Sequence, residues 1–320
     1  MADQFPGRAF KLTPASVDAS HRRYFRASFD DASLIAMDAP PPQEDCRPFV
    51  MVAGLLSGAG VHAPSILAQD LDCGFLLLSD LGTQTYLDAL DESSADRLFG
   101  DAIDALLRWQ AASRPSVLPE YDSALLRREL DLFPDWYLSR HLQVALDAQQ
   151  RAVLESTFSL LIDNGLAQPR VFVHRDYMPR NLMVSAPNPG VLDFQDAVYG
   201  PISYDIVSLF RDAFISWEEE RVLDWTVRYW EKARALGLPV RADFSQFYQE
   251  FEWMGLQRHL KVLGIFARLQ YRDGKPDYLQ DTPRFLQYAR DVARRYTAFT
   301  PLLRLLDQVA PQKSDCGSTS

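Results

Sequence analysis

The spacing of hydrophobic and polar positions changes along this chain, and the first part carries the pattern of β-strands. Residues 21–28 (HRRYFRAS) and 33–39 (SLIAMDA) flank the turn-like FDDAS, which predicts two strands joined by a turn. The apolar run at 74–82 (GFLLLSDLG) predicts a buried strand that ends in a turn. Residues 46–60 instead carry apolar residues at helical spacing before a glycine pair, which predicts one helix in this region.

From about residue 91 onward the period becomes that of long amphipathic helices. The predicted helices span 92–113, 122–142, 148–165, 203–215, 219–237, 243–270 and 282–296. The third is expected to end at Asn164-Gly165, since this pair favours a helix C-terminus. Short strands near 170–173, 182–184 and 190–192 interrupt the series. We therefore predict a small strand-rich lobe at 1–82, a larger helical lobe at 83–310 and a disordered tail at 311–320.

Composition and charge narrow the class of protein without naming a function. The 320 residues carry a formal charge of −10 at pH 7 and a pI near 5.0, which argues against nucleic acid or an anionic membrane surface as the main partner. Three distant cysteines and the lack of an apolar signal segment predict reduced thiols in a cytoplasmic protein. We expect a small-molecule partner and no obligate protein partner.

The most informative chemistry lies in the stretch FVHRDYMPRNLMVSAPNPGVLDFQDAVYG at residues 172–200. It contains the pattern His174-x-Asp176-x4-Asn181, followed by Asp193 at the end of the next apolar run. Phosphoryl transfer from a nucleotide needs Mg²⁺, oxygen ligands to hold it, and a carboxylate that orients the accepting hydroxyl. One Asp for the hydroxyl and an Asn with a second Asp for the metal supply that set. The alternative is that these residues only form turns and caps.

This stretch resembles the catalytic loop and metal-binding segment of the aminoglycoside phosphotransferase and choline kinase-like superfamily, small-molecule relatives of the protein kinases. The superfamily's usual HGD is HRD here. The resemblance implies that Asp176 is the catalytic base, that Asn181 and Asp193 bind Mg²⁺, and that His174 shapes the loop. In GPISYDIVSL, Asp205 would brace the catalytic loop; the alternative is an ordinary acidic residue at a helix N-terminus.

Five segments narrow the resemblance to the bacterial anomeric sugar kinases of cell-wall recycling. They are RRYFR, MDAPP, GFLLLSDLG, HRDYMPRNLMV and VLDFQDAVYGPISYDIVSLFRDAF. This resemblance implies an α+β, two-lobed protein kinase-like fold, with a small antiparallel β N-lobe and a larger, mainly helical C-lobe. It also implies ATP and Mg²⁺ as cofactors and the C1 hydroxyl of N-acetylmuramic acid and N-acetylglucosamine as acceptor.

The segments expected to bind the nucleotide differ from the kinase pattern. Met37 stands where a strand lysine is expected, the helix at 46–60 has no glutamate, and the segment before the second strand has no glycine-rich loop. Phosphate contacts would then come from the basic strand HRRYFR, or that strand is simply solvated. Its candidates are Arg22 and Arg26 on one face and Arg23 on the other. Adenine would lie against Ser79, Asp80 and Leu81, although Asp80 is equally a turn residue.

The acceptor pocket is expected among the helices after residue 203. Residues 254–275 are strongly basic, which suits a neutral or carboxylate-bearing sugar, or forms a solvated helix face. The substrate candidates are Arg180, Asp196, Arg211, Arg258 and Lys261. Two other functions stay open at this point. One is an aminoglycoside or choline-like phosphotransferase, and the other is a nucleotide-binding pseudokinase that has lost the lysine–glutamate pair.

Overall fold

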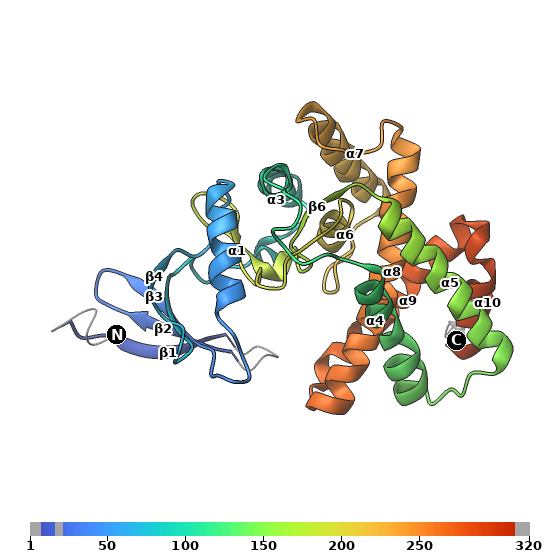
Figure 1. The fold of residues 1–320 in the computed structure, drawn as a ribbon, viewed down its shortest axis with the longest axis horizontal. Coiled ribbons are helices and arrows are strands. Elements are labelled where there is room, and N and C mark those ends of the chain that lie inside the picture. Colours follow the sequence, from blue (N-terminus) through green and yellow to red (C-terminus); the bar gives the residue numbers. More distant parts are fainter. Residues whose placement is uncertain (1–7, 17–21, 311–320) are drawn as a thin grey trace, which may run out of the picture. The chain divides into compact units, whose positions relative to one another are not determined.

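The computed structural model describes residues 8–16 and 22–310, and Figure 1 shows the course of the chain. The chain forms two compact units, each assembled from segments that are far apart in sequence. Unit 1 comprises Met1–Pro119, Val171–Tyr199 and Glu220–Leu238, and unit 2 comprises Glu120–Arg170, Gly200–Glu219 and Pro239–Ser320. The lobe boundary predicted at residue 82 falls within unit 1 and stays a prediction. The predicted disordered tail lies outside the described residues.

Unit 1 contains the sheet and the short strands that surround the motif. Its elements are β1 (Lys11–Ser16), β2 (Arg23–Ser28), β3 (Ser33–Asp38), α1 (Arg47–Gly58), β4 (Ile66–Asp70), β5 (Phe75–Ser79), α2 (Tyr86–Ala89), α3 (Ala95–Ala111), β6 (Arg170–Val173), η2 (Pro179–Asn181), β7 (Leu182–Met183), β8 (Gly190–Val191), β9 (Val198–Pro201) and α7 (Glu219–Ala235). The predicted strands and helices of this unit are confirmed, whereas β1 and β4 are additional elements.

Within the described residues, the first five strands form one antiparallel sheet in the order β1-β2-β3-β5-β4. A tight turn, in which the Phe29 N–H donates to the Ala32 carbonyl at 2.8 Å, joins β2 to β3 and sets their register. Tyr24 is then opposite Met37, and Arg26 is opposite Ile35. Since directly opposed residues share a face of the sheet, these four side chains lie on one side of it.

Unit 2 is helical and is built around one long helix. Its elements are α4 (Ser123–Leu132), η1 (Phe133–His141), α5 (Ala148–Ala167), α6 (Tyr204–Phe210), α8 (Phe244–Asp273), η3 (Pro276–Asp281), α9 (Thr282–Arg295), η4 (Thr297–Phe299) and α10 (Thr300–Val309). Helix α8 contacts α4, η1, α5, α6 and α9, and Figure 1 shows these helices gathered around it. Helix α10 is an element that the sequence pattern missed.

Three predicted helix boundaries in unit 2 are wrong. The helix expected over 203–215 ends as α6 at Phe210. The helix expected over 122–142 ends as α4 at Leu132 and continues as the π-helical η1, because Pro134 has no N–H for the α-helical ladder. The helix expected to end at Asn164-Gly165 runs on to Ala167. This helical glycine is closely packed, since a Cβ on it would lie 3.3 Å from Leu126 Cδ1 and 3.2 Å from Met254 Cε.

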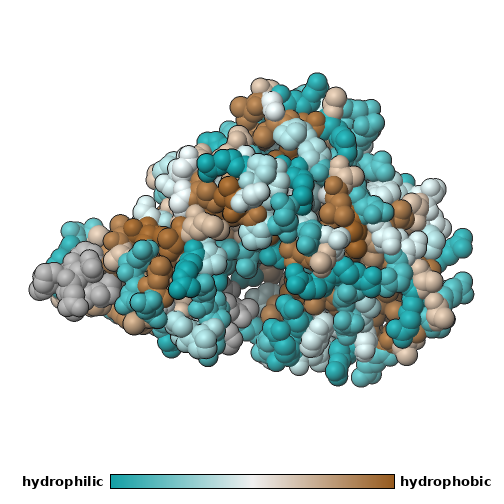
Figure 2. Space-filling model, viewed as in Figure 1, coloured by the Kyte–Doolittle hydropathy of each residue, from teal (hydrophilic) through white to brown (hydrophobic). Residues whose placement is uncertain are grey.

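Hydrophobic residues on the described surface are scattered. Figure 2 shows hydrophobic residues in small groups among hydrophilic ones on the visible face. Across residues 8–16 and 22–310, none of the helices combines the length and the apolar character that crossing a membrane would need. Cys46 and Cys73 are free thiols, as predicted, while Cys316 lies outside the described residues.

Candidate active site

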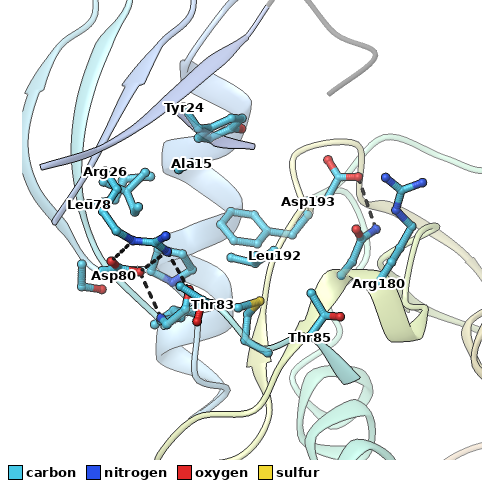
Figure 3. A pocket seen from close by; sticks show the side chains of 18 of the residues that line it. Ala15, Tyr24, Arg26, Leu78, Asp80, Thr83, Thr85, Arg180, Leu192 and Asp193 are labelled. Carbon is cyan, nitrogen blue, oxygen red and sulfur yellow. Dashed lines mark hydrogen bonds and ion pairs between the residues drawn. The ribbon is translucent and has the colours of Figure 1, made fainter. Parts of the chain in front are cut away.

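Unit 1 contains a cavity of about 290 Å³ between its sheet and the motif at residues 172–200 (Figure 3). The sheet side is lined by Tyr24 and Arg26 from β2, Ile35 from β3, and the segment 78–83 that follows β5. The opposite side is lined by Arg180, Asn181, Met183, Leu192, Asp193 and Phe194. The five-stranded sheet and the predicted metal ligands thus face one another across a single space.

His174 connects the two halves of the motif. Its Nε2 donates to the Leu192 carbonyl at 3.0 Å, and its Nδ1 accepts from the Asp176 N–H at 3.2 Å. These bonds require the neutral ring with its proton on Nε2. Burial lowers the pKa of His174 to about 4, although Asp176 and the Leu192 carbonyl act in the opposite direction. The predicted loop-shaping role therefore has a geometric basis, since this ring fixes the Asp176 loop to the strand that precedes Asp193.

Asn181 and Asp193 are adjacent in space. The Asn181 Nδ2 donates to the Asp193 Oδ2 at 3.3 Å and to the Asp176 carbonyl at 3.0 Å, while the Leu192 N–H donates to the Asn181 carbonyl at 2.9 Å. Because the amide nitrogen is used in this way, the amide oxygen of Asn181 is the atom that a cation would meet. An amide oxygen beside a carboxylate is a donor set that Mg²⁺ accepts, with phosphate and water as its other ligands.

The Asp193 carboxylate has a further partner, and Mg²⁺ binding by the Asn181–Asp193 pair stays a prediction. Over the described residues no group of three or more His, Cys, Asp or Glu side chains is arranged to hold a metal. Gln195, which sequence reasoning missed, donates from Nε2 to the Asp193 Oδ1 at 2.7 Å and orients the carboxylate. No strand pattern could have indicated this role, because Asp193 has a left-handed backbone and Gln195 begins a turn.

Two residues of the motif adopt left-handed backbone conformations that disfavour a Cβ. Arg175 has φ 76° and Asp193 has φ 61°. Such conformations cost roughly 1–3 kcal/mol and persist where the surrounding structure enforces them, often at functional sites. Arg175 occupies the position at which the superfamily's HGD motif has glycine, so its φ explains why glycine is usual there. The strain at Asp193 aims a metal-ligand candidate into the cavity (Figure 3).

Asp176 has a backbone held from several sides. Its carbonyl accepts from Asn181 Nδ2 and from the Met178 N–H at 2.9 Å, and its own N–H is bound to His174. The residue is partly exposed and is not among the residues that line the cavity. A carboxylate on a rigid, accessible loop next to the Asn181–Asp193 pair is suitably built to orient an acceptor hydroxyl.

The far side of the cavity is organised by an ion pair. The Arg26 Nε and Nη2 donate to the Asp80 carboxylate at 2.5 Å and 3.0 Å, and Nη2 also donates to the Gly82 carbonyl at 2.8 Å (Figure 3). Burial opposes ionisation, but hydrogen bonds from Arg26 and Ser33 lower the pKa of the Asp80 carboxyl. Asp80 also accepts from the Gly82 N–H at 3.0 Å, which is the turn role considered for it.

The other nucleotide-side candidates separate as strand alternation predicts. Ser79, Asp80 and Leu81 all line the cavity. Arg23 is on the opposite face of β2, where it pairs with Asp38 and stays largely exposed. Arg22 has its Nη2 2.9 Å from the Glu44 Oε2, and both side chains are mostly buried. Contact of these residues with a nucleotide remains a prediction, and the glycine-free segment at 17–21 lies outside the described residues.

Apolar side chains occupy the place of the kinase lysine–glutamate pair. Met37 is fully buried between Tyr24 and Leu76 in the sheet register. Phe49 of α1 packs against Phe194 with the two rings tilted and their centroids 4.6 Å apart, and both line the cavity. Helix α1 is therefore anchored to the segment that follows Asp193 by a pair of aromatic rings instead of by an ion pair to the sheet.

The acceptor candidates are divided between the units. Arg180 and Asp196 are in unit 1, whereas Arg211, Arg258 and Lys261, together with the loop-bracing candidate Asp205, are in unit 2. Arg211 Nη2 donates to Glu219 at 2.5 Å. Asp205 is buried at the start of α6. The roles of these residues stay predictions.

The basic face of α8 is not a solvated surface at Arg258 and Lys261. Both side chains are buried. The Lys261 ammonium is 2.8 Å from the Glu129 carboxylate and donates to the Tyr204 hydroxyl at 2.9 Å. Burial raises the pKa of the Asp212 carboxyl, and the positive charge of Arg258 partly offsets this effect. Lys261 thus has internal partners, which sequence reasoning missed because Glu129 lies on a different helix.

The chain belongs to the phosphotransferase enzyme family, whose sequence profile matches residues 11–243. Among its relatives is the N-acetylmuramate/N-acetylglucosamine kinase of Pseudomonas aeruginosa, which is 60% identical over 296 residues that cover 92% of this chain and 88% of the relative. The protein of the same name from Neisseria meningitidis serogroup B is 51% identical over 321 residues, covering 98% and 96%. The family resemblance read from the motifs is confirmed.

Solved structures confirm the kinase-like fold. The choline kinase LicA from Streptococcus pneumoniae matches with a TM-score of 0.64 at 14% identity, covering 91% of this chain and 96% of the other. An ADP-bound aminoglycoside phosphotransferase matches with a TM-score of 0.60 at 14% identity, with the same coverage. At such low identity these matches establish the fold and leave the acceptor open.

Proposed function

We propose that this chain is a cytoplasmic kinase that transfers the γ-phosphoryl group of ATP to the anomeric C1 hydroxyl of N-acetylmuramate and N-acetylglucosamine in cell-wall recycling. The observation that carries the choice of sugar is the 60% identity, over 92% of the chain, to a protein named for both sugars. The adjacency of Asn181 and Asp193 on one side of the cavity supports the choice of reaction.

In this proposal Asp176 accepts a hydrogen bond from the C1 hydroxyl and orients its oxygen toward the γ-phosphorus. The C1 oxygen bonds to phosphorus as the bond to the β–γ bridging oxygen breaks, the hydroxyl proton passes to the Asp176 carboxylate, and ADP leaves. Asn181 and Asp193 would hold Mg²⁺, which when bound neutralises charge on the phosphates. His174 keeps the base and the Asp193 segment at a fixed separation through its two hydrogen bonds.

The nucleotide would occupy the 290 Å³ cavity, with its base against the segment that follows β5. Backbone groups of Asp80 and Leu81 belong to this segment, and the Arg26–Asp80 pair holds its turn in shape. The apolar side chains of Ile35 and Leu78 offer the flat, dry surface that a purine needs. Adenine recognition would therefore depend mainly on the backbone.

The decisive experiment supplies the purified protein with MgATP and, separately, N-acetylmuramate, N-acetylglucosamine, an aminoglycoside and choline. We expect phosphorylation of both sugars, with the phosphorus coupled to C1 in the NMR spectrum of the product. Asp176→Asn should lower kcat by about 10²–10⁴-fold. Asp163→Asn, a change at an exposed acid of α5, is the matched control and should leave kcat unchanged. Turnover of choline or the aminoglycoside alone would refute the proposed substrates.

A further inference from the structure

The cavity must provide positive charge for the phosphates in a way that differs from the kinase pattern. During phosphoryl transfer, charge is spread over the oxygens of the transferred group, and protein cations stabilise it. The strand position expected to carry a lysine holds Met37, which is fully buried and apolar. Some other side chain that faces the metal-ligand candidates must therefore take this part.

Arg26 is poorly suited to it. Its guanidinium makes two bonds to the Asp80 carboxylate and one to the Gly82 carbonyl. Hydrogen bonding to Asp80 raises the pKa of Arg26, which reflects how firmly the pair is joined. Its charge is thus largely neutralised by Asp80. This ion pair lies at the end of the cavity that the segment after β5 forms. Moving it to a phosphate would leave the mostly buried Asp80 carboxylate without its partner.

Arg180 is the other cation among the described residues that line this cavity. It belongs to η2, the single turn that also carries Asn181, so the backbone that positions one positions the other. The turn is fixed by the buried Pro179, by the Asn181 N–H donating to the Met178 carbonyl at 2.8 Å, and by the Leu182 N–H donating to the Pro179 carbonyl. Arg180 lines the same side of the cavity as Asn181 and Asp193, as Figure 3 shows.

We propose that Arg180 contacts the γ-phosphoryl group and supplies the positive charge that the absent strand lysine does not. A guanidinium presents a planar pair of donors that matches two phosphate oxygens, and it stays charged throughout the reaction. This inference rests on the proposed phosphoryl transfer, but it does not depend on which sugar accepts the group. The inference gives Arg180 a catalytic role, whereas the sequence analysis listed it as a candidate for binding the sugar.

The test uses Arg180→Ala and Arg180→Lys in the full chain, with Arg97→Ala as the matched control. Arg97 is an exposed residue of α3 in the same unit, where its Nη1 is 4.0 Å from the Asp101 carboxylate. Two quantities are measured. One is the ratio of ATP to ADP affinity in the presence of Mg²⁺, obtained by calorimetry without any sugar. The other is kcat and KM for N-acetylmuramate and for N-acetylglucosamine.

We expect Arg180→Ala to lower the ATP preference over ADP by about tenfold or more, because only ATP has the γ-phosphoryl group. The value of kcat should fall about 10²–10³-fold for both sugars, with little change in either sugar's KM. Arg180→Lys should recover part of each loss, since it keeps the charge without the bidentate geometry. Arg97→Ala should match the wild type. Melting temperatures of all variants separate a loss of contact from a loss of fold.

Two results would overturn the inference. A loss confined to N-acetylmuramate, seen as a raised KM, would show that Arg180 binds the carboxylate of that sugar. An unchanged ATP preference together with kcat within about threefold of the wild type would show that the phosphates need no help from Arg180. Failure of the wild type to phosphorylate either sugar would refute the proposed function, yet the ATP and ADP affinities would still decide the role of Arg180.

Discussion

The aromatic rings of Phe49 and Phe194 lie 4.6 Å apart, and this contact joins helix α1 to the segment that follows Asp193. In the kinase pattern an ion pair between a strand lysine and a helix glutamate connects the helix to the sheet. Here the aromatic pair connects α1 to a different element, and the strand position holds the buried, uncharged Met37. The orientation of α1 in this protein therefore depends on apolar packing against the motif.

Restoring the lysine should not improve this protein. Met37→Lys would place an ammonium at a fully buried position whose cross-strand neighbours are Tyr24 and Leu76, neither of them acidic. We expect the free energy of unfolding in urea to fall by about 3–5 kcal/mol. Met37→Leu, which preserves volume, should cost less than about 1.5 kcal/mol. Equal stability of the two variants would show that the site has room and a partner for a charge.

Arg175 offers a test of backbone strain in the motif. Its φ of 76° disfavours any residue with a Cβ. Arg175→Gly and Arg175→Ala both remove the guanidinium and differ mainly in that atom. The glycine variant should be the more stable by about 1 kcal/mol, since the left-handed conformation costs an L-residue roughly that much. Thermal or urea unfolding of the pair measures the difference, and an alanine variant of equal or higher stability would contradict it.

The same glycine-to-alanine change should have opposite effects in two helices. At Gly264 of α8 an added Cβ would lie 2.4 Å from the Leu132 carbonyl oxygen, so the two helix backbones would have to separate. We expect Gly264→Ala to destabilise the protein by about 1–3 kcal/mol or more. Gly54 is exposed on α1 with nothing near its missing Cβ, so Gly54→Ala should stabilise it by about 0.5–1 kcal/mol. Unfolding curves for both variants show whether each change raises or lowers the free energy of unfolding.

Acidification should weaken the protein partly through His174. Its pKa is about 4 in the folded chain, below the usual 6.5, because the ring is buried. Above pH 6.5 the ring is neutral in both states and contributes nothing to the pH dependence. As the pH falls from 6.5 toward 4, the unfolded chain binds a proton that the folded chain resists, so stability declines by about 3 kcal/mol in total.

The variant His174→Gln, which keeps a donor toward the Leu192 carbonyl and cannot titrate, should show a shallower loss of stability over this range. His259, whose pKa burial also lowers, provides a second titrating site that the variant leaves intact. Urea unfolding at several pH values between 7 and 4.5 measures both slopes. Parallel curves for wild type and variant would mean that His174 titrates normally in the folded protein.

The sequence by itself determined the local elements and the motif. Hydrophobic spacing located the strands and the long helices, because each element buries one side with a fixed period. The resemblance carried by the motif implied that Asn181 and Asp193 act together, and the structure shows a hydrogen bond between them next to the paired strands β7 and β8. A boundary failed at Asn164-Gly165, where the helix runs on to Ala167, because glycine can also adopt helical dihedral angles.

Only the tertiary structure decided which charges remain available for chemistry. Lys261 looked like part of a basic surface until the fold placed it against Glu129, more than one hundred residues earlier in the chain. Arg26 is a phosphate candidate by sequence, and only the fold pairs it with Asp80 and buries Met37. The energy of a charge depends on burial and on its nearest partner, and both are set by long-range packing that no local pattern contains.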